Sequence, residues 1–309
     1  MTPSRSADGR KTQLDAVAIV LLLGCSAIWG VAQVAAKFTL QDVPPLLQAG
    51  LRSLGAAVLL LAWSRWRGLD LFSRDGTGRA GLLAGALFAA EFACMFIGLQ
   101  FTTASRMVVF LYMAPFVVAL GMPLIARHER LSAPQAAGLV LAFAGVVWAF
   151  AEGFTQPAAG PRQWLGDALG FAGAVLWGLT TLATRATGLS TALPEKTLMY
   201  QLAVSGVALT VASPLAGEPW PQAIGATAAA ALAFQVVVVT FASYLTWFWL
   251  VRHYPATRVS AFVLLTPVFG LLAGVLLLNE PLTTRLVVAL AAVCVGIALV
   301  NRAPGKARA

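Results

Sequence analysis

The stretch GLLAGALFAAEFACMFIGLQ, residues 81–100, decides the fold class of this chain. It contains one charged side chain, that of Glu91, in a length that matches the roughly 20 apolar residues an α-helix needs to cross a bilayer core. Its apolar residues do not alternate with polar ones, as they would in a membrane barrel strand. Because a helix satisfies its own backbone hydrogen bonds in lipid, the stretch predicts a transmembrane helix.

Comparable stretches follow one another along almost the whole chain. Hydrophobic residues make up 59% of the 309 residues and charged residues 11%, a balance that water-soluble domains do not show. We predict an all-α membrane protein of about ten spans, at residues 14–37, 44–64, 80–100, 103–126, 132–151, 165–186, 194–213, 224–251, 256–278 and 282–300. The first span follows basic residues, as a secretory signal does, but it is longer and has no convincing cleavage site.

Membrane topology accounts for the formal charge of +9. Lys and Arg in short loops stay on the cytoplasmic side, and placing both termini in the cytoplasm puts most of the 21 basic residues in inner segments. The outer loops then hold Lys37, Arg106, Arg162 and Arg285, and Arg52 lies within a span. Because the basic residues are spread over several segments, we expect no nucleic-acid partner.

Short motifs recur at intervals of about 150 residues, the signature of an internal repeat. The recurring pairs are Ala-Ile-Trp-Gly at 27–30 and Val-Leu-Trp-Gly at 175–178, Ala-Ser-Arg at 104–106 and Ala-Thr-Arg at 256–258, Pro115 and Pro267, and residues 128–132 and 279–283. The repeat predicts two units, residues 14–151 and 165–300, of five helices each. An odd number of helices inverts the second unit in the membrane, and secondary transporters are often built from inverted repeats.

These motifs resemble those of the EamA branch of the drug/metabolite transporter superfamily. The resemblance covers the whole chain: two five-helix units, each with a Trp-Gly in its first helix, a proline in its fourth and a Glu-X-Leu turn before its fifth. The YddG-type exporters of aromatic and other amino acids are the most similar members, through residues 90–92, residues 111–115, Tyr244 and Trp247. The resemblance implies a cavity enclosed by the first four helices of each unit, with the fifth helices peripheral. Ala114 stands where a bulky aromatic residue is expected, which indicates a wider pocket.

Glu91 and Arg52 are the candidate charged residues of a binding site. Each is placed near the centre of a predicted span, where a charge costs about 2.5 to 3.5 kcal/mol on insertion scales, so each needs a wet cavity or a partner. In the functional interpretation, Arg52 binds a substrate carboxylate and Glu91 binds a substrate amine or a proton. In the structural alternative, the two residues form an ion pair that holds the bundle together.

Aromatic residues and two prolines complete the candidate site. Aromatic rings in the helices that should enclose the cavity offer apolar and cation-π surface to an amphipathic solute, although each ring can equally serve packing. These candidate substrate-binding residues are Trp29, Tyr112, Trp177, Tyr200, Tyr244 and Trp247. Pro115 and Pro267 interrupt the backbone hydrogen bonds of the fourth helix of each unit, as a gating hinge or as a static kink.

The chain is predicted to be a secondary transporter. It has no Walker-type phosphate loop and no His, Cys and carboxylate cluster with metal-ligand spacing, so we expect neither direct use of ATP nor a metal or other cofactor. We predict export of amino acids, aromatic and other neutral ones, or of similar small metabolites, by alternating access across the inner membrane. The expected partners are a small-molecule substrate and the lipid bilayer, and the expected state is a monomer or weak homodimer.

Two alternatives stand beside amino-acid export. One is a carrier for nucleotide sugars, sugar phosphates or organic cations. The other is an intramembrane enzyme, which we do not expect, because His128 and His253 lie apart and provide no catalytic cluster. The substrate, the coupling ion and the direction of transport are not determined by the sequence.

Overall fold

The computed structural model describes residues 14–125, 133–155, 157, 159–254 and 262–300. Every regular element within these residues is helical. Both predicted cytoplasmic ends, at 1–13 and 301–309, lie outside the described residues, as do the motifs at 128–132, with His128, and at 256–258. The predicted orientation of the chain in the membrane therefore stays a prediction.

The helical elements follow the hydropathy pattern closely. They are α1 Ala16–Thr39, α2 Pro45–Trp66, α3 Gly78–Gly98, α4 Ala104–Leu111, α5 Ala114–Ile125, α6 Ala133–Thr155, α7 Gln163–Ala186, η1 Gly188–Ser190, α8 Pro194–Leu215, α9 Ala226–Ala233, η2 Phe234–Ala242, α10 Ser243–His253, η3 Val263–Leu265, α12 Thr266–Leu278 and α13 Thr284–Val300. Among the described residues, 8 helices are long and apolar enough to cross a membrane, counting 104–125 and 226–250 as continuous. The spans predicted at 256–278 and 282–300 correspond to shorter apolar helices.

Local sequence sets several of the helix boundaries. The Asp15 carboxylate accepts a hydrogen bond of 2.9 Å from Ala18 N and begins α1, and Thr103 similarly accepts one from Arg106 N and begins α4. Pro45 is the first residue of α2, where a missing N–H costs no helical hydrogen bond. Asn279 ends α12 in the left-handed region, with φ of 52°.

Both predicted proline breaks coincide with interruptions of a helix. Pro115 is the second residue of α5, and the helical run 104–125 is interrupted by a turn at Tyr112 and Met113 between α4 and α5. Pro267 is the second residue of α12, directly after the 3₁₀ turn η3. Proline lacks the N–H that would bond to the preceding turn, which explains why the regular helix restarts at these positions.

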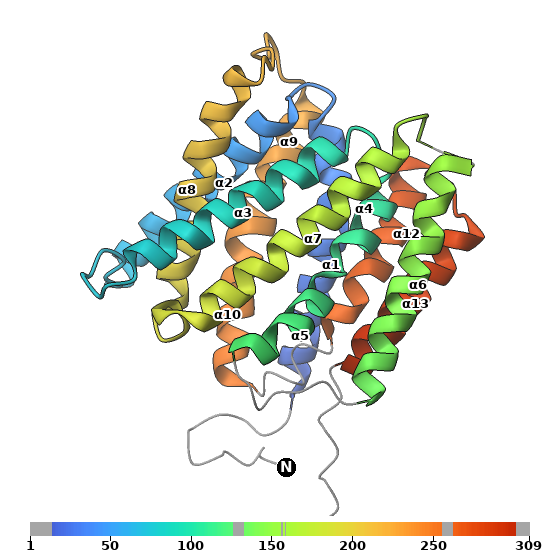
Figure 1. Ribbon diagram of the computed structural model, residues 1–309. Helices are drawn as coiled ribbons and strands as arrows, with labels where there is room; N and C mark the ends of the chain where they lie inside the picture. Colours follow the sequence, from blue (N-terminus) through green and yellow to red (C-terminus); the bar gives the residue numbers. More distant parts are fainter. Residues whose placement is uncertain (1–13, 126–132, 156, 158, 255–261, 301–309) are drawn as a thin grey trace, which may run out of the picture.

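The bundle is organised by pairs of helices from opposite halves of the chain. The helix α2 packs along α8, α6 along α13, α3 along α7 and α8, and α1 along α12 (Figure 1). In Figure 1 the α6 and α13 pair lies at one side of the bundle, away from the α2 and α8 pair. Glycines allow close contacts: a Cβ added at Gly81 would meet the ring of Tyr200, and one added at Gly166 would meet Thr102 and Gly98 O.

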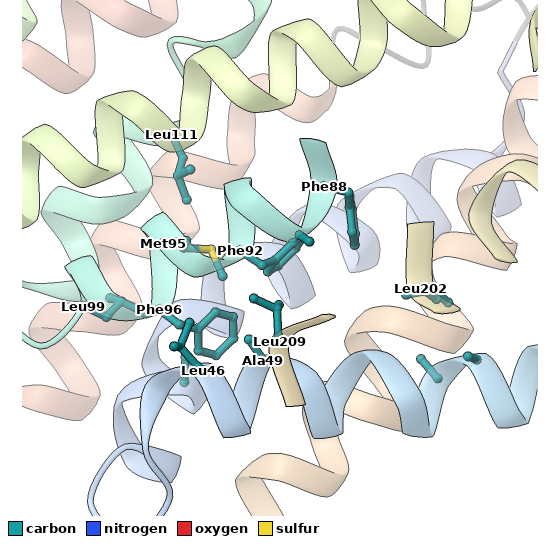
Figure 2. Close-up of a cluster of buried hydrophobic side chains, with 14 of the residues drawn as sticks. Leu46, Ala49, Phe88, Phe92, Met95, Phe96, Leu99, Leu111, Leu202 and Leu209 are labelled. Carbon is teal, nitrogen blue, oxygen red and sulfur yellow. The ribbon is translucent and has the colours of Figure 1, made fainter. Parts of the chain in front are cut away.

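The apolar side chains divide between an interior and an outer surface. A buried cluster of α2, α3 and α8 contains Phe92 and Phe96, which face Leu46 and Ala49 of α2 (Figure 2). Large apolar residues also point outward, such as Leu124 and Leu276, which are 86% and 74% exposed. Soluble monomers rarely expose so many apolar residues, so these outward faces suit contact with lipid.

Candidate functional site

A cavity of about 290 Å³ lies between α1, α2, α3, α4, α7, α8, η2 and α10. Its wall is mostly aromatic and aliphatic, with a few polar side chains. The volume is near the lower end of the roughly 300 to 1,000 Å³ of typical ligand pockets, which fits a small metabolite. The peripheral helices α6 and α13 contribute none of the described lining residues, in agreement with the place expected for the fifth helix of each unit.

The structure brings most of the candidate binding residues together at this cavity. Those that line it are Trp29, Arg52, Glu91, Tyr112, Trp177, Tyr244 and Trp247. Tyr200 is not among the described lining residues: its ring packs over Gly81, and it borders a second hollow beside Phe72 and Lys196. The reason is that α8 presents Leu198 and Gln201 to the cavity, and Tyr200 points toward α3 instead.

The aromatic residues form two groups. In the first, Trp29 contacts Tyr244 and Trp247 edge to face, with ring centroids 6.3 and 5.3 Å apart. In the second, Tyr112 and Trp177 are nearly perpendicular, at 88° and 5.8 Å. The Trp29 indole also donates a hydrogen bond of 2.7 Å to Ser243 Oγ. Each group joins a helix of the first half to one of the second, and the edge-to-face geometry fixes the rings that form the wall.

Arg52 lies in this wall and is held from two sides. Its Nε donates a hydrogen bond of 2.6 Å to Thr240 Oγ1, and its Cζ lies 4.1 Å from the centroid of the Phe92 ring. Thr240 belongs to η2, a π-helix, a distortion that often marks functional positions. Arg52 and Glu91 interact electrostatically, but these two described side chains form no direct ion pair. The predicted pair is therefore separated, with the cavity beside both residues.

Glu91 and Gln33 provide acceptors at the cavity. Glu91 is 6% exposed, and its Oε2 has no hydrogen-bond partner among the described residues. The same holds for Oε1 of Gln33, which is 9% exposed. Gln33 was not predicted as a site residue, although the sequence contains a signal for it: Gln33 lies one helical turn after Trp29, on the same face of α1.

A second charged cluster lies outside the cavity lining and was not predicted. Arg106 was expected in an outer loop, but it is 3% exposed within α4. Its Nη1 lies 2.7 Å from Glu152 Oε2, and its Nη2 lies 2.6 Å from Asp167 Oδ2. Arg52 and Glu91 are therefore not the only buried charges of the helices. The cluster connects α4, α6 and α7, the last of which belongs to the second half of the chain.

Two carboxylates from the second half of the chain bind the N-termini of helices in the first half. Glu280, of the second Glu-X-Leu turn, accepts hydrogen bonds from the backbone N–H groups of Ala104 and Ser105 at 2.6 and 2.9 Å. Glu218 accepts bonds of 2.9 and 3.1 Å from the N–H groups of Leu46 and Leu47. Each carboxylate satisfies N–H groups that lack partners within the helix and interacts favourably with the helix dipole.

One ion pair joins a connection between two helices to the first turn of a third helix. Asp75 Oδ2 lies 2.7 Å from Lys196 Nζ, and Asp75 Oδ1 accepts a hydrogen bond of 2.6 Å from Thr77 Oγ1. These hydrogen bonds, that of Lys196 first, hold the pKa of the Asp75 carboxyl well below its usual range. The pair ties the connection between α2 and α3 to the start of α8.

A bundle of apolar helices around a small cavity with mostly aromatic and aliphatic walls is the architecture of a multi-pass membrane transporter of small solutes. The chain belongs to the EamA-like transporter family, whose sequence profile matches it twice, over residues 16–151 and 164–302.

Relatives of this family extend over nearly the whole chain. The uncharacterized transporter YvbV of Bacillus subtilis is 29% identical over 94% of this chain and 93% of its own length. An uncharacterized transporter of Archaeoglobus fulgidus is 27% identical over 84% of this chain and 89% of its own. A chloroplastic WAT1-related protein of Arabidopsis thaliana is 26% identical over 90% and 68%. A solved crystal structure, 22% identical, shares the fold with a TM-score of 0.63 over 92% of this chain and 97% of that chain.

Proposed function

We propose that this transporter exports neutral amino acids, aromatic ones included, or closely similar amphipathic metabolites, across the inner membrane. The observation that carries the proposal is the presence of one carboxylate and one guanidinium, those of Glu91 and Arg52, in a cavity whose described wall is otherwise uncharged and mostly aromatic and aliphatic. A zwitterion complements both charges, and its side chain contacts the rings. The volume of about 290 Å³ suits a solute of that size.

The mechanism proposed is alternating access between two inverted units, residues 14–151 and 165–300. The pairing of α2 with α8 and of α6 with α13 supports it, because each helix there packs against its counterpart in the repeat. The matched breaks at Pro115 and Pro267 supply a bending point in each unit. The site lies between Trp29 and Trp177, at matching positions of the two units, as expected for a transporter built from repeats.

The residues of the cavity have distinct proposed roles. Glu91 binds the amino group and Arg52 the carboxylate of the solute, while Trp29, Trp177 and Trp247 hold its apolar part. The remaining rings, Tyr112 and Tyr244, complete the wall. Exchange is driven by the solute gradient or by an ion gradient. The described residues that line the cavity all come from one chain, in keeping with a monomer or weak homodimer.

Counterflow in liposomes tests the proposal. Purified protein is reconstituted with unlabelled solute inside, and uptake of labelled phenylalanine, methionine and threonine is compared with that of sugars and nucleotides. We expect exchange of the amino acids, and impaired exchange in Glu91→Gln and Arg52→Gln proteins that remain monodisperse. If another solute class exchanges while all three amino acids fail, amino-acid transport is refuted.

A further inference from the structure

Two residues that line the cavity, Glu91 and Gln33, each have a buried acceptor oxygen that the described part of the chain leaves without a hydrogen-bond partner, Glu91 Oε2 and Gln33 Oε1. Gln33 contacts α3 through its amide nitrogen, which lies 3.4 Å from Met95 Sδ. Met95 is one helical turn after Glu91, so both lie on the same face of α3. Glu91 and Gln33 therefore line the same cavity from α3 and α1, and the Gln33 amide contacts α3 one helical turn after Glu91.

The positively charged group of the cavity, the Arg52 guanidinium, differs from these acceptors because protein groups already bind it. The Arg52 guanidinium already donates to Thr240 Oγ1 and lies over the Phe92 ring, with Phe96 also within 5.9 Å. Part of its charge is thus compensated by protein groups before a solute arrives. Glu91 interacts electrostatically with Arg52, but its Oε2 has no hydrogen-bond partner among the described residues, and a buried acceptor left unpaired costs free energy until a donor reaches it.

We infer that the ammonium group of the solute is its anchor, bound by Glu91 and Gln33, and that a carboxylate is accepted by Arg52 without being required. The inference rests on the proposed function and specifies which group of the solute the cavity requires. It assigns to the cavity primary amines with an apolar body, including amines that have lost the carboxylate of an amino acid. Gln33 is the specificity-determining residue in this assignment, since its neutral oxygen needs an N–H donor.

The chemistry of the two acceptors distinguishes ammonium from other cations. A primary ammonium has three N–H donors, enough for both Glu91 and Gln33. A quaternary ammonium carries the same charge and can contact the Trp29 and Trp247 rings, but it has no N–H and leaves Gln33 Oε1 unpaired. Discrimination between primary and quaternary amines therefore reports on Gln33, and discrimination between amines and carboxylates reports on Glu91.

Four probes with one phenyl body separate these contributions: phenylalanine, 2-phenylethylamine, 3-phenylpropionate and the N-trimethylated phenylethylammonium ion. Affinity is measured on the purified full chain by ligand-dependent thermal stabilisation and by inhibition of amino-acid counterflow. In the unmodified protein we expect phenylethylamine to bind about 10-fold or more tightly than phenylpropionate, the difference of about one charge-assisted hydrogen bond.

Variants assign the contributions to residues. Glu91→Gln should weaken the binding of phenylethylamine by about 10- to 100-fold and change the affinity for phenylpropionate by at most about twofold. Gln33→Met, of similar length, should weaken the primary amine and not its trimethylated analogue. Because Gln33→Met removes no charge, it keeps the test available if Glu91→Gln fails to fold. The matched control is Glu195→Gln, a buried carboxylate in the first turn of α8 outside the cavity lining, which should change no affinity.

The outcomes separate the inference from the proposed function. Phenylpropionate binding as tightly as phenylethylamine, or amine affinity unchanged in both Glu91→Gln and Gln33→Met, overturns the amine anchor while amino-acid exchange still stands. Exchange of sugars or nucleotides with no binding of the four probes overturns both. Exchange of phenylalanine without any binding of phenylethylamine makes the carboxylate the required group and refutes the inference alone.

Discussion

Replacing Arg106 by Met should destabilise the protein by about 3 to 5 kcal/mol, because it removes the cation from a buried cluster of two carboxylates. Arg106 donates through Nη1 to Glu152, through Nε and Nη2 to Asp167, and through Nη2 to the Ala149 carbonyl at 2.6 Å. If each of these charge-assisted bonds contributed roughly 1.5 to 3 kcal/mol, the sum of their contributions would exceed the predicted destabilisation of about 3 to 5 kcal/mol. The sum overstates the loss, since one carboxylate can take up a proton once the cation is gone.

Hydroxyl groups around the carboxylates set the lower bound of that estimate. Thr102 Oγ1 donates to Asp167 at 2.6 Å, and Thr283 Oγ1 donates to Glu152 at 3.0 Å. These bonds remain after the Arg106→Met substitution, and they still satisfy part of the hydrogen-bonding capacity of each carboxylate. A loss near 3 kcal/mol then corresponds to good compensation by the hydroxyls, and a loss near 5 kcal/mol to little of it.

The assay is thermal unfolding of the purified protein in detergent, compared at one heating rate because membrane proteins often unfold irreversibly. The expected decrease in Tm is roughly 5 to 15 °C. The triple variant Arg106→Met, Glu152→Gln and Asp167→Asn should recover much of the loss, since it removes the uncompensated charges together. Arg285→Met serves as the control, because this half-buried arginine donates only to Thr155 in the described residues and should change stability by at most about 0.5 kcal/mol. A triple variant less stable than Arg106→Met alone would refute the reasoning.

Three further predictions concern the rest of the chain. Asp75→Asn should lower Tm at neutral pH, and the difference from the unmodified protein should shrink as pH falls below the ordinary carboxyl pKa of about 3.9, because a depressed folded-state pKa stabilises only where the carboxyl is ionised. Gly81→Ala should cost about 1 to 3 kcal/mol by forcing apart α3 and α8, whereas Gly24→Ala, where an added Cβ meets nothing within 4 Å, should be tolerated; equal Tm values for the two would contradict this. Pro115→Ala and Pro267→Ala should each slow counterflow several-fold with little change in Tm if the breaks act as hinges, and unaltered rates would identify static kinks.

The course of the helices could be predicted because lipid imposes a simple rule. Backbone groups in hydrocarbon must be satisfied within the segment, so apolar length alone located α1, α2 and α3 to within about two residues, a normal margin for helix ends. The prolines predicted the breaks at α5 and α12 for an equally local reason. The π-helix η2 carries no such local signal, and its register depends on contacts with α1 and α2.

The placement of individual charges could be predicted only in part. Glu91 and Arg52 were found because each lies deep in an apolar stretch. Arg106 follows the N-cap residue Thr103 by three positions, and this proximity to a helix start predicted a place at the edge of a loop. Its burial depends on Glu152 and Asp167, which are 46 and 61 residues distant and approach it only in the folded bundle. Pairing over such distances is a tertiary property that hydropathy does not contain.

The Arg106 cluster and the charged residues of the cavity differ in how completely their charges are hydrogen-bonded within the protein. In the Arg106 cluster, guanidinium and carboxylates are joined by short, charge-assisted bonds, as expected of a part of the bundle selected for stability. In the cavity, Glu91 is the one ionisable side chain of the described residues with a buried atom lacking a hydrogen-bond partner. Packing alone would favour an apolar residue at that position, because an unpaired buried carboxylate destabilises the folded state. Such local violations are expected where function overrides stability, and under the inference made above the missing partner is the ammonium group of the solute.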